Sequence, residues 1–212
     1  MIIWPPLPIV APEFLIACST GDIRTARRIL RATPALDICT GYDIAFRHAC
    51  MNGHLRVARW LLRARPEVDI DNDIHDIMFN QWCVNHACAN GHQHIIEWLL
   101  YKYPEIDIRE NGDYAVRLMC YAQHYETLKW LFYKTPNAVS YDVIGAMFCM
   151  ACAVNDLPNS KWAFRVHPDI SSEQVEDAFI NACQNDYTLI MRWLLTIKPD
   201  LAGHPLGLIA SI

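Results

Sequence analysis

Glycine is scarce in this sequence: eight of the 212 residues are glycine and twelve are proline. Because these residues punctuate turn-rich domains, their low number argues against an all-β fold. Runs of 18 or more apolar residues are also absent, which excludes a membrane-spanning helix. The first ten residues lack a basic stretch before an apolar core, so we expect no signal peptide.

Neither sign of charge dominates. The chain has 18 Lys+Arg against 23 Asp+Glu, a net charge of −5, and 53% of its residues are hydrophobic. This balance is too apolar for intrinsic disorder and too acidic for a general nucleic-acid binder. The length is sufficient for one domain or two small ones with a buried core. We therefore expect a globular protein that binds neither nucleic acid nor membranes.

The cysteines do not indicate a secreted disulfide framework. Their number, nine, is odd, and no asparagine begins an Asn-x-Ser/Thr glycosylation site. Disulfide frameworks are typical of smaller secreted chains. We expect reduced thiols and a cytoplasmic location.

Six of the cysteines recur at a nearly constant interval. They are Cys18, Cys50, Cys88, Cys120, Cys152 and Cys183, separated by 32, 38, 32, 32 and 31 residues. Four positions before them stand the bulky apolar residues Phe14, Phe46, Val84, Val116, Phe148 and Phe179. Sixteen positions after them stand Pro34, Pro66, Pro104, Pro136, Pro168 and Pro199. Ten positions after five of them stand Trp60, Trp98, Trp130, Trp162 and Trp193. Self-similarity at this period predicts stacked repeat units.

Each copy is predicted to form two short helices. In the second copy Phe46, Ala49 and Cys50 share one helical face. The apolar face of a second helix is formed by Val57, Ala58, Trp60, Leu61 and Leu62. Three positions after the cysteines stand Gly21, Gly53, Gly91, Gln123, Asn155 and Asp186. All of these except the glutamine are residue types that tolerate the left-handed backbone ending a helix.

Two segments carry a family resemblance. Ala49 to Leu62, with the sequence Ala-Cys-Met-Asn-Gly-His-Leu-Arg-Val-Ala-Arg-Trp-Leu-Leu, resembles the core of an ankyrin repeat, and Ala87 to Leu100 resembles it too. The resemblance extends over residues 12 to 200 and implies an all-α, ankyrin-type solenoid of about six stacked helix-turn-helix repeats. This variant is most similar to the ankyrin arrays of large DNA viruses of amoebae.

One ankyrin feature is missing, because no copy has the Thr-Pro-Leu-His tetrapeptide of the first helix. Asp43, Asp113, or Ser171 with Gln174 are the candidates to cap the first helices instead. The connections between repeats are left open between hairpin-like turns, plain loops and longer first helices.

These patterns divide the chain into three parts. We expect an extended segment at 1–11, the repeat domain at 12–200 and a capping tail at 201–212. The repeats are placed at about 12–40, 41–72, 79–110, 112–141, 142–172 and 173–200. The first copy has Arg24, Arg27, Arg28 and Arg31 on one helical face, as expected of a polar terminal cap. The fifth copy, with Asn159 and Ser160 at apolar positions, is expected to be the weakest.

No motif points to catalysis or to a cofactor. The sequence has no phosphate-binding glycine loop and no His-Glu-x-x-His helix. Cys149 and Cys152 form a Cys-x-x-Cys inside a predicted first helix, where core packing is favoured over redox chemistry. His54, His92 and His124 share one register, too far apart for a common zinc ion, and are expected to bond local backbone. The tryptophans are expected in the core. The alternative left open is a metal- or small-molecule-binding protein on an ankyrin scaffold.

The resemblance implies that the chain is a monomeric interaction module whose concave face binds another protein, a host protein if the chain is viral. Carried onto this sequence, the candidate binding residues are Arg47, Met51, Asn52, Asn85, Ala89, Asn90, Arg117 and Tyr121. The insertion from Asp69 to Gln81 is interpreted either as an acidic finger over that partner or as a spacer. Arg56, Arg59, Arg63 and Arg65 extend the basic stripe, which is either a solvated outer face or a grip for an acidic partner.

Overall fold

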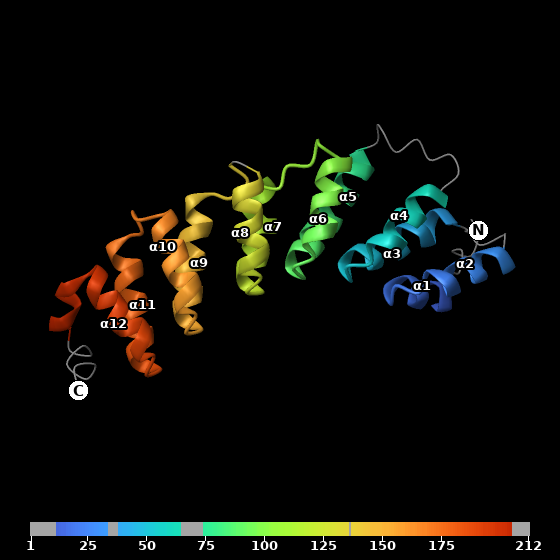
Figure 1. The fold of residues 1–212 in the computed structure, drawn as a ribbon. Coiled ribbons are helices and arrows are strands. Elements are labelled where there is room, and N and C mark those ends of the chain that lie inside the picture. Colours follow the sequence, from blue (N-terminus) through green and yellow to red (C-terminus); the bar gives the residue numbers. More distant parts are fainter. Residues whose placement is uncertain (1–11, 34–37, 65–73, 136, 205–212) are drawn as a thin grey trace, which may run out of the picture. The chain divides into compact units, whose positions relative to one another are not determined.

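The computed structural model describes residues 12–33, 38–64, 74–135 and 137–204, and for 38–43 and 74–80 only the backbone. Within these ranges the chain forms twelve α-helices and one short 3-10 helix, without a strand (Figure 1). The helices follow one another in pairs, as the repeat pattern predicts. The chain divides into two compact units, Met1–Glu110 and Asn111–Ile212. The predicted segments 1–11 and 205–212 lie outside the described residues.

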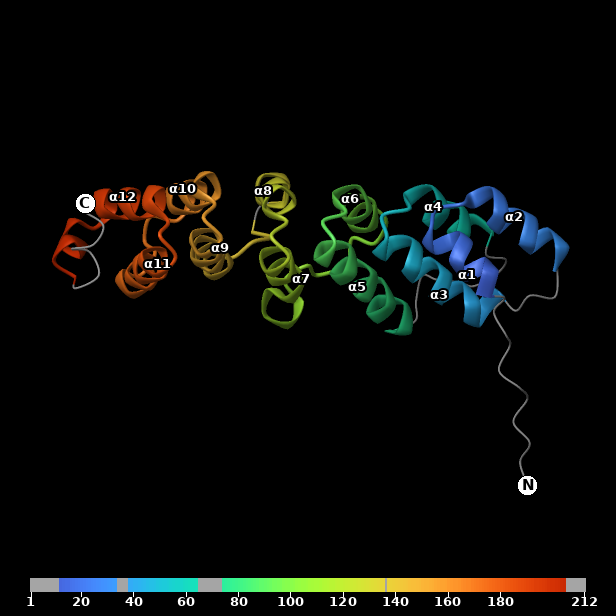
Figure 2. The same ribbon diagram turned by 90° about the horizontal axis from the view of Figure 1, so that it is seen from below.

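The first unit contains three helix pairs. Its helices are α1 (Pro12–Ser19), α2 (Ile23–Ala32), α3 (Ile38–Met51), α4 (Leu55–Ala64), α5 (Ile74–Ala89) and α6 (Gln93–Lys102). The first helices of the pairs, α1, α3 and α5, form one layer, and the second helices, α2, α4 and α6, form the other (Figure 2). Neighbouring first helices pack directly on one another, α1 on α3 and α3 on α5.

The second unit repeats this arrangement. Its helices are α7 (Glu110–Tyr121), α8 (Tyr125–Lys134), α9 (Tyr141–Ala153), α10 (Leu157–Val166), α11 (Ser172–Gln184) and α12 (Thr188–Ile197), followed by the 3-10 helix η1 (Pro199–Gly203). Here α9 packs on α10 and α11, and α12 packs on η1. The start of the predicted tail therefore covers the last repeat, with Leu201 only 3% exposed and the ring of His204 6.5 Å from that of Phe179.

The core is formed by the predicted registers. All six apolar residues four positions before the cysteines are buried, and so are five of the six register cysteines, while Cys183 is half-buried. Where this apolar residue is Phe14, Phe46 or Phe148, it contacts the tryptophan of the next copy. The ring centroids are 6.4 Å apart for Phe14 and Trp60 and 6.2 Å apart for Phe46 and Trp98. The apolar surface of each repeat is thus buried on its neighbour.

The prediction that the tryptophans belong to the core is correct only for Trp162, which is 6% exposed. Trp60, Trp98, Trp130 and Trp193 are half-buried. They lie on the second helices, where one side of the indole packs inward and the other borders the surface. Sequence periodicity could not separate these two cases, because both place a large apolar residue on the inner side of the helix.

All six first helices end in a residue with a left-handed backbone. This includes α7, where that residue is Gln123, a residue type that did not predict this conformation. Gln123 has φ 61°, close to the 60° of Asn155 and the 57° of Asp186. In every copy the next residue donates its backbone N–H to a carbonyl five positions back, as from His124 to Met119 at 2.8 Å. This bond satisfies a helix-end carbonyl and offsets the strain at the glutamine.

The prediction that the register histidines bond local backbone was wrong for His54. Its Nε2 donates to the carbonyl of Ser19, 2.9 Å away in the preceding repeat. The imidazole lies over the turn there, so closely that a Cβ on Gly21 would come 2.6 Å from Nδ1. His92 lies over Gly53 in the same way, with Nδ1 2.8 Å from such a Cβ. These histidines therefore join successive repeats.

The three candidate caps have different outcomes. Ser171 and Gln174 form the predicted capping box at the start of α11. The prediction for Asp43 was wrong, because α3 begins at Ile38 and Asp43 lies inside the helix. Asp113 has a left-handed backbone, φ 63°, in a kink at the start of α7, and its carboxylate accepts a 2.6 Å hydrogen bond from Ser140, the N-cap of α9.

The long first helices α3 and α5 match one of the alternatives left open for the connections between repeats. Both begin before the predicted repeat starts at 41 and 79. Since α5 starts at Ile74, residues 74–81 of the insertion are helix. Residues 69–73 lie outside the described residues.

In the fifth copy Ser160 is fully buried, and its Oγ donates to the carbonyl of Asp156 at 2.7 Å.

The helix register can be tested with two adjacent residues. Cys88 is fully buried and Ala89 is partly exposed. We expect Cys88→Arg to lower the free energy of unfolding by about 3–5 kcal/mol, because it buries an unpaired charge. Ala89→Arg should change it by less than about 1 kcal/mol. Urea unfolding measures both, and equal losses would show that the register is wrong.

The histidine contact between repeats gives a second prediction. Gly21 and Gly112 both have positive φ, 78° and 68°, but a Cβ on Gly112 would meet nothing within 4 Å. Gly112→Ala should cost only the left-handed strain, about 1–2 kcal/mol. Gly21→Ala should cost about 1–3 kcal/mol more because it displaces His54. In a His54→Ala background the two losses should become equal. An unchanged difference in urea unfolding would contradict the histidine contact.

Candidate protein-binding surface

The first helices present a regular exposed stripe, which we call the first-helix face. Positions four before, one before and at the cysteine are buried, as Val84, Ala87 and Cys88 show with 0% exposure. The positions six, three and two before the cysteine, and one and two after it, lie on the other side of the helix. This face is formed by α1, α3 and α5 in the first unit and by α7, α9 and α11 in the second.

In the first unit the predicted residues lie on this face. Met51 and Ala89 are half-buried, while Asn52 and Asn90 are exposed. The amide Nδ2 of Asn52 donates to the carbonyl of His48 at 2.8 Å, and that of Asn90 donates to His86 at the same distance. Each asparagine thus satisfies a carbonyl in the last turn of its own helix. Their role is partly structural, which the sequence prediction did not distinguish.

Arg47 belongs to a stack of three side chains that joins α3 to α5. Its guanidinium carbon lies 4.9 Å from the ring centroid of Trp82, and the centroid of Trp82 lies 3.8 Å from that of His86. Burial, together with the positive charge of Arg47, lowers the pKa of His86 below its usual range. The stack limits the conformational freedom of these side chains before a partner binds. This reduces the entropy cost of binding.

Asn85 is positioned by its own helix. Gln81, one turn earlier, is 7% exposed and donates its Nε2 to Oδ1 of Asn85 at 3.1 Å. This hydrogen bond orients the half-buried side chain of Asn85. Among the predicted residues, Arg47 is itself part of this stack, and Asn85 lies three positions after Trp82 on the same face of α5.

The second unit holds the remaining predicted residues. Tyr121 ends α7 and is 65% exposed. Arg117 is half-buried, and its Nε donates to the carbonyl of Gly112 at 3.0 Å. The arginine thus folds back onto the kink at the start of its own helix.

Several exposed apolar residues of this face were not predicted. Ile16, Ile44 and Tyr114 are 60%, 41% and 49% exposed. They escaped prediction because only the positions three before and one and two after the cysteine were considered. The signal was present: six positions before the cysteine stand Ile44, Trp82 and Tyr114, one turn along the same helical stripe.

The described residues offer little to reaction chemistry. They contain no group of three or more His, Cys, Asp or Glu side chains that could hold a metal ion. Burial raises the pKa of Cys18, Cys120 and Cys152 to about 12, so these thiols remain protonated at neutral pH and are poor nucleophiles. Burial also raises the pKa of Cys149, the other cysteine of the Cys-x-x-Cys pair. No helix in the described ranges is both long and apolar enough to cross a bilayer.

The sequence matches the protein family described as ankyrin repeats (3 copies), over residues 14–111 and again over 46–142. Together the two matches cover more than half of the chain. They include the repeats with the stack of Arg47, Trp82 and His86 and with Tyr121. No curated protein matches the chain.

The stack of Arg47, Trp82 and His86 makes a prediction about titration. Arg47→Met removes the positive charge that lowers the pKa of His86, while burial still acts on the ring. The pKa of His86 should therefore rise toward its usual value of about 6.5 without reaching it. NMR titration measures this pKa. The control Arg59→Met, on the second helix α4, should leave the pKa of His86 unchanged. A lower or unchanged pKa of His86 in the Arg47 variant would contradict the contact.

Proposed function

The chain belongs to the ankyrin-repeat family, and on that premise we propose that it is a binding module whose first-helix face takes up another protein. Ankyrin repeats are generally protein–protein interaction modules. The scaffold holds the backbone of this face rigid through contacts between repeats and leaves its exposed positions free to vary. A partner is then recognised by the side chains of the face.

The observation that carries the proposal is the distribution of exposed apolar side chains. Of the nine large hydrophobic residues that are well exposed in the described ranges, six lie at or next to first helices. They include Ile16, Tyr121 and Tyr141, each at least 60% exposed. Exposed apolar and aromatic residues gathered on one kind of surface are typical of protein-binding sites.

The composition of the face in the first unit supports the same use. Trp, Met and Arg are enriched where interfaces are most tightly packed. Trp82, Met51 and Arg47 are such residues, and each is half-buried, so that part of its surface is already fixed by the fold. We propose these three as the centre of the interface in the first unit, with Asn85 and Asn90 as polar contacts at its edge.

The finer proposals concern the setting. We propose that the chain acts as a monomer in the cytoplasm, without a cofactor and without chemistry of its own. The resemblance of its repeat variant to viral ankyrin arrays extends this to capture of a host protein in the host cytoplasm. Proximity labelling in cells that express the chain would identify the partner.

Substitution on each face then tests the proposal. Met51→Glu and Tyr121→Glu, made separately, place a charge at the first-helix face of each unit. Each should weaken partner binding by about thirtyfold or more, the range of an interface hot spot. Isothermal calorimetry measures the affinity, and the melting temperature should stay unchanged because both side chains are exposed at least in part.

The control reverses charge on the second helices. Arg24→Glu with Arg31→Glu should leave the affinity for this partner intact, since both arginines lie exposed on α2. If the α2 reversals abolish binding and the first-helix changes do not, the first-helix face is not the interface.

A further inference from the structure

The second helices of the first unit border a groove that the proposed interface does not use. Between α4 and α6 lies a pocket of about 650 Å³ lined by Arg59, Leu62, Arg63, Trp98, Tyr101 and Lys102. A pocket of about 300 Å³ adjoins it between α2 and α4, and Arg59 and Arg63 line both. We call the two together the outer groove.

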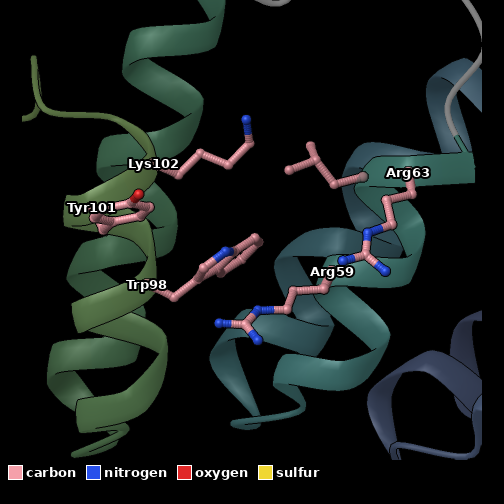
Figure 3. Close-up of a pocket in the computed structure, with 6 residues that line it drawn as sticks. Arg59, Arg63, Trp98, Tyr101 and Lys102 are labelled. Carbon is pink, nitrogen blue, oxygen red and sulfur yellow. The ribbon is translucent and has the colours of Figure 1, made fainter.

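The outer groove combines an aromatic floor with cationic walls. Trp98 and Lys102 extend from α6 toward α4, and Arg59 extends from α4 toward the indole (Figure 3). The guanidinium carbon of Arg59 lies 5.8 Å from the ring centroid of Trp98. In the adjoining pocket that of Arg27 lies 5.7 Å from Trp60. Within the described part of the chain, no carboxylate forms an ion pair with an arginine of this groove or with Lys102.

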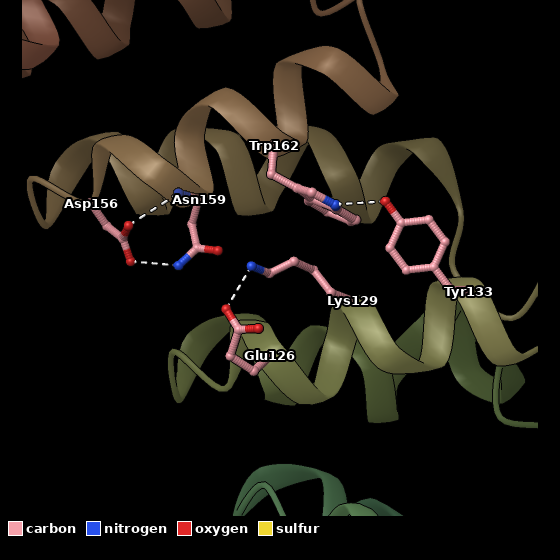
Figure 4. A network of polar contacts seen from close by, with 6 residues as sticks. All are labelled: Glu126, Lys129, Tyr133, Asp156, Asn159 and Trp162. Carbon is pink, nitrogen blue, oxygen red and sulfur yellow. Dashed lines mark hydrogen bonds and ion pairs between the residues drawn. The ribbon is translucent and has the colours of Figure 1, made fainter.

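In the second unit, the residues at the corresponding positions bind one another through an ion pair and a hydrogen bond. Lys129 forms an ion pair with Glu126 and lies over Trp162, 5.9 Å from the ring centroid (Figure 4). The indole Nε1 of Trp162 donates to the hydroxyl of Tyr133 at 3.0 Å (Figure 4). Trp162 is only 6% exposed. The repeat architecture therefore does not by itself leave this face open.

Two register changes explain the difference. Six, nine and thirteen positions after the cysteine, α8 has Glu126, Lys129 and Tyr133, whereas α4 has Arg56, Arg59 and Arg63. The first change replaces the carboxylate partner of the central cation by another cation. The second replaces a hydroxyl that accepts the indole proton by a guanidinium, which has no acceptor. The second unit has an ion pair and an indole hydrogen bond at these positions. Among its described residues, the first unit has positive charges without a carboxylate partner and an indole N–H without an acceptor.

From this contrast we infer that the outer groove binds an acidic peptide segment of a partner protein, one whose carboxylates alternate with apolar side chains. Arg59, Arg63 and Lys102 offer only hydrogen-bond donors, and no acceptor among the described residues faces the indole N–H of Trp98. Carboxylates supply acceptors in the geometry that guanidinium groups bind bidentately. Leu62 and the ring of Tyr101, which is 87% exposed, offer apolar contact between these charges.

A peptide fits these features better than a nucleic acid. Single-stranded nucleic acids gain much of their affinity by stacking bases on open aromatic faces. Here guanidinium groups already lie over Trp60 and Trp98. The net charge of the whole chain, −5, also opposes a long polyanion. The outer groove is thus a second docking surface, on the helix layer opposite the first-helix face.

The chain itself supplies the variant that tests this inference. Arg56→Glu with Arg63→Tyr gives α4 the residues that α8 has at these two positions, which the same repeat fold accommodates. The probe is a fluorescent synthetic peptide of alternating Glu and Leu. We expect the variant to weaken binding of this peptide by about tenfold or more, because it removes two cationic contacts. Fluorescence anisotropy measures the affinity.

A matched control separates the groove from general charge. Lys161→Glu with Arg165→Tyr makes the same change of charge at exposed positions of α10, and it should leave the affinity within about twofold. Met51→Glu on the first-helix face should also leave it unchanged. Equal weakening by the α10 control would overturn the inference, and so would undiminished binding by the α4 variant.

Two further measurements use the unaltered protein. The indole N–H signal of Trp98 should move in NMR spectra when the peptide binds, while that of Trp162 should not, and the reverse would overturn the inference. A peptide of alternating Gln and Leu should not bind. If a single-stranded oligonucleotide of equal charge binds more tightly than the acidic peptide, the groove is a nucleic-acid site and the inference is wrong.

Discussion

The contact between successive repeats is the interaction on which the rest of this structure depends. A single helix pair cannot bury its own apolar surface, so Phe14 is completed by Trp60 of the next copy and Phe46 by Trp98. The polar part of the same contact is made by His54, which reaches back to the carbonyl of Ser19. The cysteine register is small because neighbouring first helices pack directly on one another.

These contacts fix the backbone and therefore separate the inside of each repeat from its two exposed faces. On the first-helix face, side chains such as Trp82 and Tyr121 can change without loss of the core, since the buried stripe lies on the other side of the helix. On the second helices the same holds for the positions six, nine and thirteen after the cysteine. One repeat fold can thus carry a closed surface at Trp162 and an open, cationic one at Trp98.

The two faces of the first unit differ in chemistry, and this difference governs what each can bind. The first-helix face offers apolar and aromatic surface held in place by the stack of Arg47, Trp82 and His86. The outer groove offers donors and positive charge around half-buried indoles. The proposed partner of the first face is recognised mainly by shape and apolar contact, whereas that of the groove is recognised by its carboxylates.

The sequence by itself determined the repeat, the helix pairs and the buried registers, because each depends on local periodicity repeated six times. It also predicted the capping box of Ser171 and Gln174, whose hydrogen bonds stay within one helix turn. Only the tertiary structure decided features that join separate copies: the reach of His54 to Ser19, the stack of Arg47 on Trp82, and the open or closed state of each tryptophan. Trp98 and Trp162 occupy the same register, and the side chain that meets each indole comes from the preceding repeat. The guanidinium of Arg59 lies over Trp98, whereas the hydroxyl of Tyr133 accepts the indole N–H of Trp162. The physical reason is that the surroundings of a side chain depend on which atoms of the neighbouring copy lie beside it. The helical periodicity within one copy does not specify those atoms.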